Sequence, residues 1–268
     1  MIRHFFTNNP MKAELEMMRH RSVPKNWDTK TGISVAVVGL IYCYMFFIMV
    51  QGARSIPPSA PIFIMYLVSA LAVPIIGHGM ISLERQNRSL PMLFTVPATV
   101  GQIVAMRAIR AMMLMLVIAV LMLMIFGILA GTRLFLNVPM DIDRSPMVAF
   151  PLGILGWFGM SFFMVGWTMW ISALSKSSGQ ALLTCIGFFI VVLVLVPLLV
   201  TSAIPGFDYE TAYWQPTSFL MQLFAGVGTA VPVWKLVATP LVWFAMGCIG
   251  LWLATNRLAK LRSEGGGE

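Results

Sequence analysis

The chain has 268 residues, of which 59% are hydrophobic and only 10% are charged, and its mean hydropathy is +0.85. Soluble domains are about 45–50% apolar and about 25% charged, and more than half of their surface is already apolar. A soluble enzyme of this length has no means of hiding so much apolar surface, and the same composition excludes a disordered chain and a fibre. The sequence therefore predicts an integral membrane protein.

Six apolar stretches are long enough to cross a bilayer, which takes about 20 residues of helix. An even number of spans places both termini on one side of the membrane. The predicted fold is an all-α membrane protein with a six-span domain over residues 32–256. The six predicted spans are residues 32–53, 60–83, 111–131, 147–174, 181–200 and 233–255.

The positions of the 18 Lys and Arg residues predict the orientation. Fourteen of them lie in the N-terminal arm, between the second and third spans, between the fourth and fifth spans, or after the sixth span. Loops that gather basic residues lie in the cytoplasm, so both termini are expected there. The membrane itself is expected to be the plasma (cell inner) membrane. The net charge of +8 is thereby explained without a nucleic-acid partner. The four basic residues of the opposite side are Arg54, Arg133, Arg144 and Lys235.

Three segments outside the spans have their own expected structure. The arm 1–31 carries Leu15 and Met18 on one helical face, so an interfacial helix and a solvated arm both remain open. Segment 201–232 contains a semi-apolar piece, 219–228, that is too short to span, and we expect the segment to form one or two short helices that dip partly into the outer leaflet before the sixth span. The end of the chain, 257–268, is expected to be a disordered cytoplasmic tail.

Catalytic and metal-binding motifs are absent from the sequence. There is no phosphate-binding G-x-x-x-x-G-K-[ST] loop and no H-E-x-x-H or G-x-S-x-G motif, so we expect no enzymatic activity. The three cysteines lie in apolar stretches, and most of the 22 methionines are scattered through them without ligand spacing, which predicts packing and no metal site. His78, in the second span, is expected to hydrogen-bond a neighbouring helix.

The loop between the second and third spans is the most specific part of the sequence. Ser89 and Pro91 are typical of a helix start, and Leu90, Leu93 and Phe94 share one helical face. This pattern predicts a short cytoplasmic helix whose apolar face needs a partner, either lipid headgroups or another protein. A second helix is expected to begin near residue 100 and to run into the third span. The candidate residues of this loop are Glu84, Arg85, Arg88, Ser89, Leu90, Leu93, Phe94 and Pro97.

This loop resembles the signature of the permease subunits of ABC-2 type ABC transporters. That signature is an acidic residue, a polar run, Gly-Thr-Leu, an apolar pair, and a Pro thirteen positions after the acid. Arg88 stands where the family usually has Gly, and Pro91 stands where it usually has an acidic residue. The matching positions are Glu84, Ser89-Leu90, Leu93-Phe94, Thr95 and Pro97, followed by Ile103 and by Arg107 in place of a Lys.

The resemblance implies a mechanism of ATP-driven export. Two permeases, identical or different, would pair, and each would dock a separate cytoplasmic ATPase through the loop helix, which would act as a coupling helix. ATP would be bound only by that partner, and loss of Leu90 or Leu93 would uncouple hydrolysis from transport. The substrate is left open, although the few polar span residues favour an apolar or amphipathic load. A membrane subunit that anchors a larger complex without transporting anything is the alternative.

The fourth predicted span carries glycines that let another helix approach closely. A crossing within the chain is the first interpretation of this pattern, and a seam between two copies is the second. The glycines are Gly153, Gly156, Gly159 and Gly166.

Overall fold

A computed structural model describes residues 60–94, 98–135, 146–196, 199, 219 and 233–264. Within these residues all regular structure is helical. The N-terminal arm, the predicted first span, Pro97 and all of segment 201–232 except Phe219 lie outside the described residues. The elements are α4 (Ala60–Gly77), α5 (Gly79–Gln86), α6 (Leu90–Phe94), α7 (Val100–Phe135), α8 (Pro146–Leu174), α9 (Ser178–Ile190), the π-helical turn η1 (Val191–Leu195) and α12 (Val233–Ser263).

Four of the described helical stretches are long and apolar enough to cross a membrane. They correspond to the second, third, fourth and sixth predicted spans. The helix at the predicted fifth span is apolar but shorter, over Ser178–Leu193. The four stretches are Ile64–Gln86, Val100–Leu121, Pro151–Leu174 and Trp234–Ser263.

The last helix is longer than the sequence suggested. We expected disorder from residue 257, but α12 continues to Ser263, so that prediction is wrong for residues 257–263. The reason is tertiary packing. Leu258 and Leu261 are buried, and the Arg262 guanidinium lies over the ring of Phe94 at 5.8 Å from its centroid.

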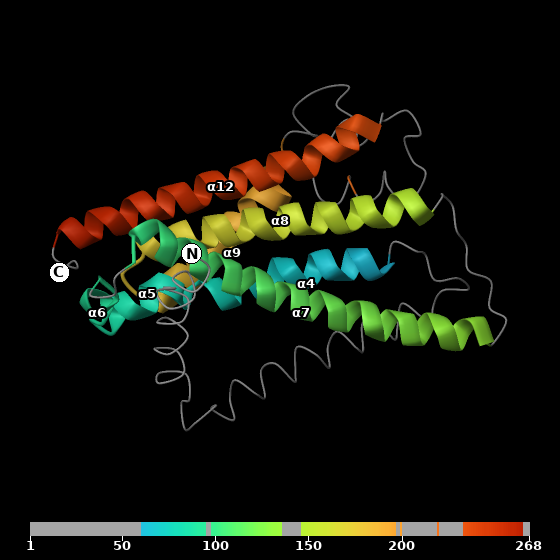
Figure 1. Ribbon diagram of the computed structural model, residues 1–268, viewed down its shortest axis with the longest axis horizontal. Helices are drawn as coiled ribbons and strands as arrows, with labels where there is room; N and C mark the ends of the chain where they lie inside the picture. Colours follow the sequence, from blue (N-terminus) through green and yellow to red (C-terminus); the bar gives the residue numbers. More distant parts are fainter. Residues whose placement is uncertain are drawn as a thin grey trace, which may run out of the picture.

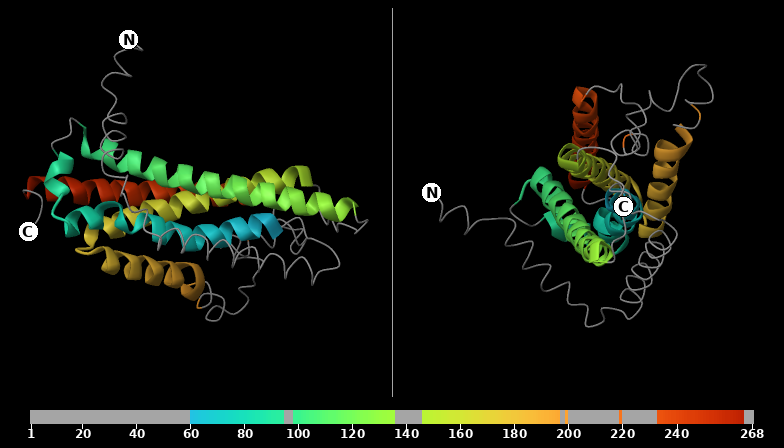
Figure 2. Two further views of the ribbon diagram at one scale, coloured as in Figure 1. Left: turned by 90° about the horizontal axis from the view of Figure 1, so that it is seen from below. Right: turned by 90° about the vertical axis from the view of Figure 1, so that its right-hand side faces the viewer.

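Helix α8 lies at the centre of the bundle and contacts α4, α5, α7, α9 and α12. Figure 1 shows α12 running beside α8 along most of its length, with α4 and α7 on the other side of α8. The end-on view of Figure 2 shows α8 enclosed by its neighbours, whereas α9 and α12 lie at the outside. Of the four candidate spans, α8 is accordingly the most enclosed and α12 the least.

Glycines bring α8 and α12 into backbone contact. A Cβ on Gly159 would lie 2.5 Å from the carbonyl oxygen of Pro240, and one on Gly250 would lie 2.6 Å from the carbonyl carbon of Gly166. A Cβ on Gly166 would meet the carbonyl oxygen of Gly247. Only hydrogen fits between these backbones, so this crossing lies within the chain.

The other two glycines of the series face different neighbours. Gly156 lies against the Tyr66 hydroxyl of α4 and the ring of Phe219, which is fully buried and meets Trp243 edge-on at 5.5 Å. Gly153 is buried, and its carbonyl accepts a hydrogen bond from the Tyr66 hydroxyl at 3.5 Å. Phe219 therefore fills the space between α8 and α12 on the side of α4.

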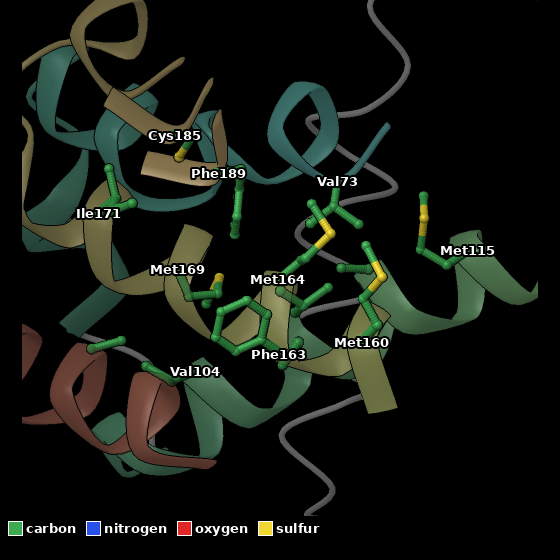
Figure 3. Close-up of a cluster of buried hydrophobic side chains, with 14 of the residues drawn as sticks. Val73, Val104, Met115, Met160, Phe163, Met164, Met169, Ile171, Cys185 and Phe189 are labelled. Carbon is green, nitrogen blue, oxygen red and sulfur yellow. The ribbon is translucent and has the colours of Figure 1, made fainter. Parts of the chain in front are cut away.

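Methionines of α8 fill the core of the bundle. Met160, Met164 and Met169 are buried and belong to one apolar cluster with Val73 of α4 and Val104 of α7. Figure 3 shows these flexible side chains interleaved around Phe163. In the described parts of the chain, no group of three or more His, Cys, Asp or Glu is placed to hold a metal ion. The burial of these methionines and their place in the core cluster are typical of packing residues.

His78 marks a break between α4 and α5. Its Nδ1 donates to the carbonyl oxygens of Pro74 and Ile75, at 3.1 and 2.7 Å. Both acceptors belong to its own helix, so the described bonds of this ring do not reach the neighbouring helix that we had expected.

Candidate coupling site at the α6 end of the bundle

Six parts of the structure meet at one end of the bundle, which we call the α6 end. They are α5, α6, the start of α7, the turn between α8 and α9, the start of α9 and the end of α12 (Figure 1). Eight of the ten Lys and Arg residues in the described ranges lie there. The eight are Arg85, Arg88, Arg107, Arg110, Lys176, Arg257, Lys260 and Arg262, and the other two are Arg133 and Lys235.

Helix α5 ends in a tight cap that needs a left-handed residue. The amide of Ser89 donates to the carbonyl of Glu84 at 2.8 Å, and the amide of Arg88 donates to that of Arg85 at 3.1 Å. This pair of bonds is the Schellman motif, whose penultimate residue adopts positive φ. Arg88 has φ 54°, the one positive-φ residue other than glycine in the described part of the chain. The geometry explains in physical terms why glycine suits this position.

The cap also changes the role of Ser89. We expected its hydroxyl to cap the following helix, whereas it donates to the Glu84 carbonyl at 3.3 Å. Ser89 therefore helps to close the end of α5.

The short helix predicted after Ser89 exists as α6, but its apolar face is not free. Leu90 is 1% exposed and Leu93 is 4% exposed, and both belong to the main core cluster. Phe94 packs against the same cluster and lies under Arg262 of α12. The partner that this face needs is the chain itself, so our expectation that lipid headgroups or a second protein would cover it is wrong. The coupling role of the segment stays a prediction.

An ion pair fixes α5 to α7. Arg107 Nη2 donates to Glu84 Oε1 at 2.7 Å, and the other terminal nitrogen of Arg107 donates to the carbonyl oxygen of Met80. Only 8% of the Arg107 side chain and 18% of the Glu84 side chain are exposed. One planar guanidinium thus holds two points of α5, one turn apart, through two separate nitrogens in a fixed geometry that the ammonium of a lysine lacks.

Two further side chains hold α5 to the turn between α8 and α9. Arg85 Nη1 donates to the carbonyl of Leu174 at 3.4 Å, at the end of α8. Gln86 Oε1 accepts from the amide of Ser178 at 3.0 Å, at the start of α9. Gln86 was not among our candidate residues, and nothing in its sequence context marks it. Helix α5 is thereby joined to α7, α8 and α9.

The start of α7 is a reciprocal cap that we also missed. The amide of Thr99 donates to Gln102 Oε1 at 2.9 Å, and the amide of Gln102 donates to Thr99 Oγ1 at 3.3 Å. The T-x-x-Q pattern is a recognised signal for this capping box, so the sequence did contain it. The cap begins α7 directly after α6.

A mainly polar set of side chains is exposed at the α6 end. The residues brought to it come from the cap of α5, from α6 and from the start of α7. They stand on elements joined by buried contacts. The exposed residues are Gln86, Asn87, Arg88, Pro91, Thr99 and Gln102.

Comparison with known proteins identifies a family. A family model described as "ABC-2 family transporter protein" matches residues 7–255, which is nearly the whole chain. No curated protein matches it.

Proposed function

The chain belongs to the ABC-2 family of transporter proteins, and from this premise we propose that it is the permease subunit of an ABC exporter driven by a separate cytoplasmic ATPase. The observation that carries the proposal is the α6 end. A short helix sits on the core through Leu90 and Leu93, and an ion pair joins the preceding helix to α7. Through these contacts, a force applied to the exposed residues of the α6 end would displace α5 and α7 as well.

In this proposal the chain binds no nucleotide of its own. The support is that its sequence contains no phosphate-binding loop of the G-x-x-x-x-G-K-[ST] type. ATP would bind and be hydrolysed on the partner, and the permease would contribute only the moving helices. A second permease would complete the substrate path.

The proposed location is the inner membrane, with six spans and both termini in the cytoplasm. The concentration of eight of the ten described Lys and Arg residues at the α6 end supports this orientation, because basic residues collect on the cytoplasmic side. The exposed apolar side chains of α7 and α12, such as Met113, Leu121 and Trp252, suit contact with lipid.

The test is co-purification from mild detergent followed by mass spectrometry. We expect the wild type to retain an ATPase that contains a phosphate-binding loop. Charge reversal at the α6 end (Arg88→Glu) should release it, because Arg88 is exposed on the proposed contact surface. The matched control is Lys235→Glu at the opposite end of the bundle, which should retain the ATPase.

Two results would contradict the proposal. The wild type could co-purify with an assembly that holds no ATPase, which would favour the anchoring alternative. Equal retention by both charge-reversal variants would place the contact elsewhere on the chain.

A further inference from the structure

A side chain of α8 enters the break between α4 and α5. The Ser172 hydroxyl accepts hydrogen bonds from the amides of Ile81 and Ser82, both at 3.0 Å. The same hydroxyl donates to the carbonyl of His78 at 2.7 Å. A hydroxyl has one donor and two acceptor sites, so Ser172 uses its full capacity on one turn of another helix.

The contact is dry and tightly packed. Ser172, Ile81 and Ser82 are 3% exposed or less, so no bulk water competes for these bonds. One turn earlier on α8, Thr168 lies against Gly77, where a Cβ on residue 77 would overlap the Thr168 methyl group. The glycine brings α4 close to α8 at the level where the serine of α8 reaches the broken turn.

A side chain that inserts into the backbone hydrogen bonds of a helix is a recognised cause of a bend. Here the Ser172 hydroxyl replaces the carbonyl acceptors that the Ile81 and Ser82 amides would have in a continuous helix. Unsatisfied amides are costly in a membrane interior, so without the hydroxyl this turn must rearrange. The conformation of the joint thus depends on a residue that is about 90 positions away in the sequence.

We propose that Ser172 is a positioning residue that fixes the joint between α4 and α5 and links movement of α5 and α6 to α8. The inference rests on the proposed function, since the movement it transmits is the one that a docked ATPase would impose. Through this joint a displacement of α6 reaches the central helix of the bundle directly. Without it, the described hydrogen bond from α5 to α8 would be that of Arg85 to the Leu174 carbonyl at the very end of α8, so a displacement of α5 and α6 would reach the body of α8 less directly.

The first test measures the joint itself, with no partner required. Hydrogen–deuterium exchange of the peptide that covers residues 79–86 is compared in the detergent-purified chain. Ser172→Ala should raise exchange of the Ile81 and Ser82 amides at least tenfold, and Ser172→Cys, which keeps the shape but accepts hydrogen bonds weakly, should raise it less. The control is Ser175→Ala, because the buried Ser175 hydroxyl donates only to Ile171 of its own helix at 2.9 Å.

The second test uses the co-purified assembly with ATP and vanadate as the probe. In the wild type, trapping should change exchange in peptides of both α5 and α8. In Ser172→Ala the change should remain in α5 and become smaller in α8, a separation that a general loss of stability does not produce.

The outcomes separate this inference from the function on which it rests. The proposed role of Ser172 would be overturned if the Ile81 and Ser82 amides exchanged at the wild-type rate in both Ser172 variants. It would also be overturned if trapping changed α8 exchange in Ser172→Ala as much as in the wild type. If the wild type binds no ATPase, the proposed function fails, while the exchange of the isolated chain still decides whether Ser172 holds the joint.

Discussion

At the scale of single residues, the backbone angle of Arg88 explains why the signature that this loop resembles has glycine at that position. Arg88 stands where the resembling signature has Gly, and its φ of 54° is one that residues with a Cβ adopt at a cost of about 1–2 kcal/mol. The Schellman cap requires this angle whatever the side chain is. Arg88 therefore keeps a basic group on the surface at the expense of some stability.

Replacing Arg88 by glycine should raise stability. We expect Arg88→Gly to increase the free energy of unfolding by about 0.5–1 kcal/mol, since glycine adopts positive φ freely but loses more entropy on folding. Arg88→Val should lower it by at least about 1 kcal/mol, because a β-branched residue is strained at this angle. Thermal unfolding in detergent measures both, with Asn87→Ala as the exposed neighbour at ordinary φ. Equal melting temperatures for the glycine and valine variants would show that the angle is not required.

The Glu84–Arg107 pair gives a second prediction at this scale. Arg107→Met should cost about 3 kcal/mol, because it leaves a largely enclosed carboxylate without its guanidinium. Adding Glu84→Gln should recover part of this loss, so the double variant should be more stable than the sum of the two single effects predicts. Arg110→Met, on the exposed side of α7, should cost less than about 1 kcal/mol. Additive single effects would show that the two side chains are not coupled.

Residue-level expectations from the sequence succeeded where local pattern decides. The apolar face of Leu90, Leu93 and Phe94 and the helix that carries it could be predicted from spacing. What covers that face could not, because Arg262 of α12, which lies over the Phe94 ring, is far away in the sequence and belongs to a polar segment. Local polarity there predicts disorder, and tertiary packing overrides it.

At the scale of elements, the contact between α8 and α12 organises the bundle. Gly159, Gly166, Gly247 and Gly250 let the two backbones touch, and without a hydrophobic driving force between helices in lipid such close packing supplies much of the stability. The spacing of small residues in α8 was visible in the sequence. The choice of α12 as the neighbour was not, because periodicity shows only that some helix approaches.

A single methyl group should disturb this crossing. Gly166→Ala should lower the free energy of unfolding by about 1–3 kcal/mol, since its Cβ would overlap the Gly247 carbonyl oxygen and force α8 and α12 apart. Gly127→Ala in α7 is the matched control, because no atom lies within 4 Å of the added Cβ. Thermal unfolding in the same detergent compares them. If Gly127→Ala lost as much stability as Gly166→Ala, the loss could not be attributed to the crossing of α8 and α12.

At the scale of the whole molecule, charge asymmetry relates the fold to the membrane. The described helices alternate in direction, so that α5, α8 and α12 end where α7 and α9 begin (Figure 1). Basic residues gather at that end, and of the ten Lys and Arg residues in the described ranges only Arg133 and Lys235 lie towards the other. Composition and charge were sufficient to predict this arrangement, since both act through the bilayer and do not depend on which helices are neighbours.

The orientation can be measured with single cysteines in a variant that lacks the three native ones. A cysteine at position 235 should react with a membrane-impermeant maleimide in intact cells, because that end is proposed to face outward. One at position 260, exposed near the end of α12, should react only after lysis. The reverse pattern would place the α6 end outside and rule out a cytoplasmic ATPase as its partner.

The most direct measurement of the central claim is photo-crosslinking from α6 in living cells. A photoreactive amino acid replaces Pro91, which is exposed on α6, and in a parallel variant it replaces Met113, which is exposed on the apolar side of α7. If the α6 end docks a separate ATPase, position 91 yields one dominant crosslink to a protein with a phosphate-binding loop, and position 113 yields none to that protein. Crosslinks from position 91 only to lipid or to proteins without such a loop would contradict the account.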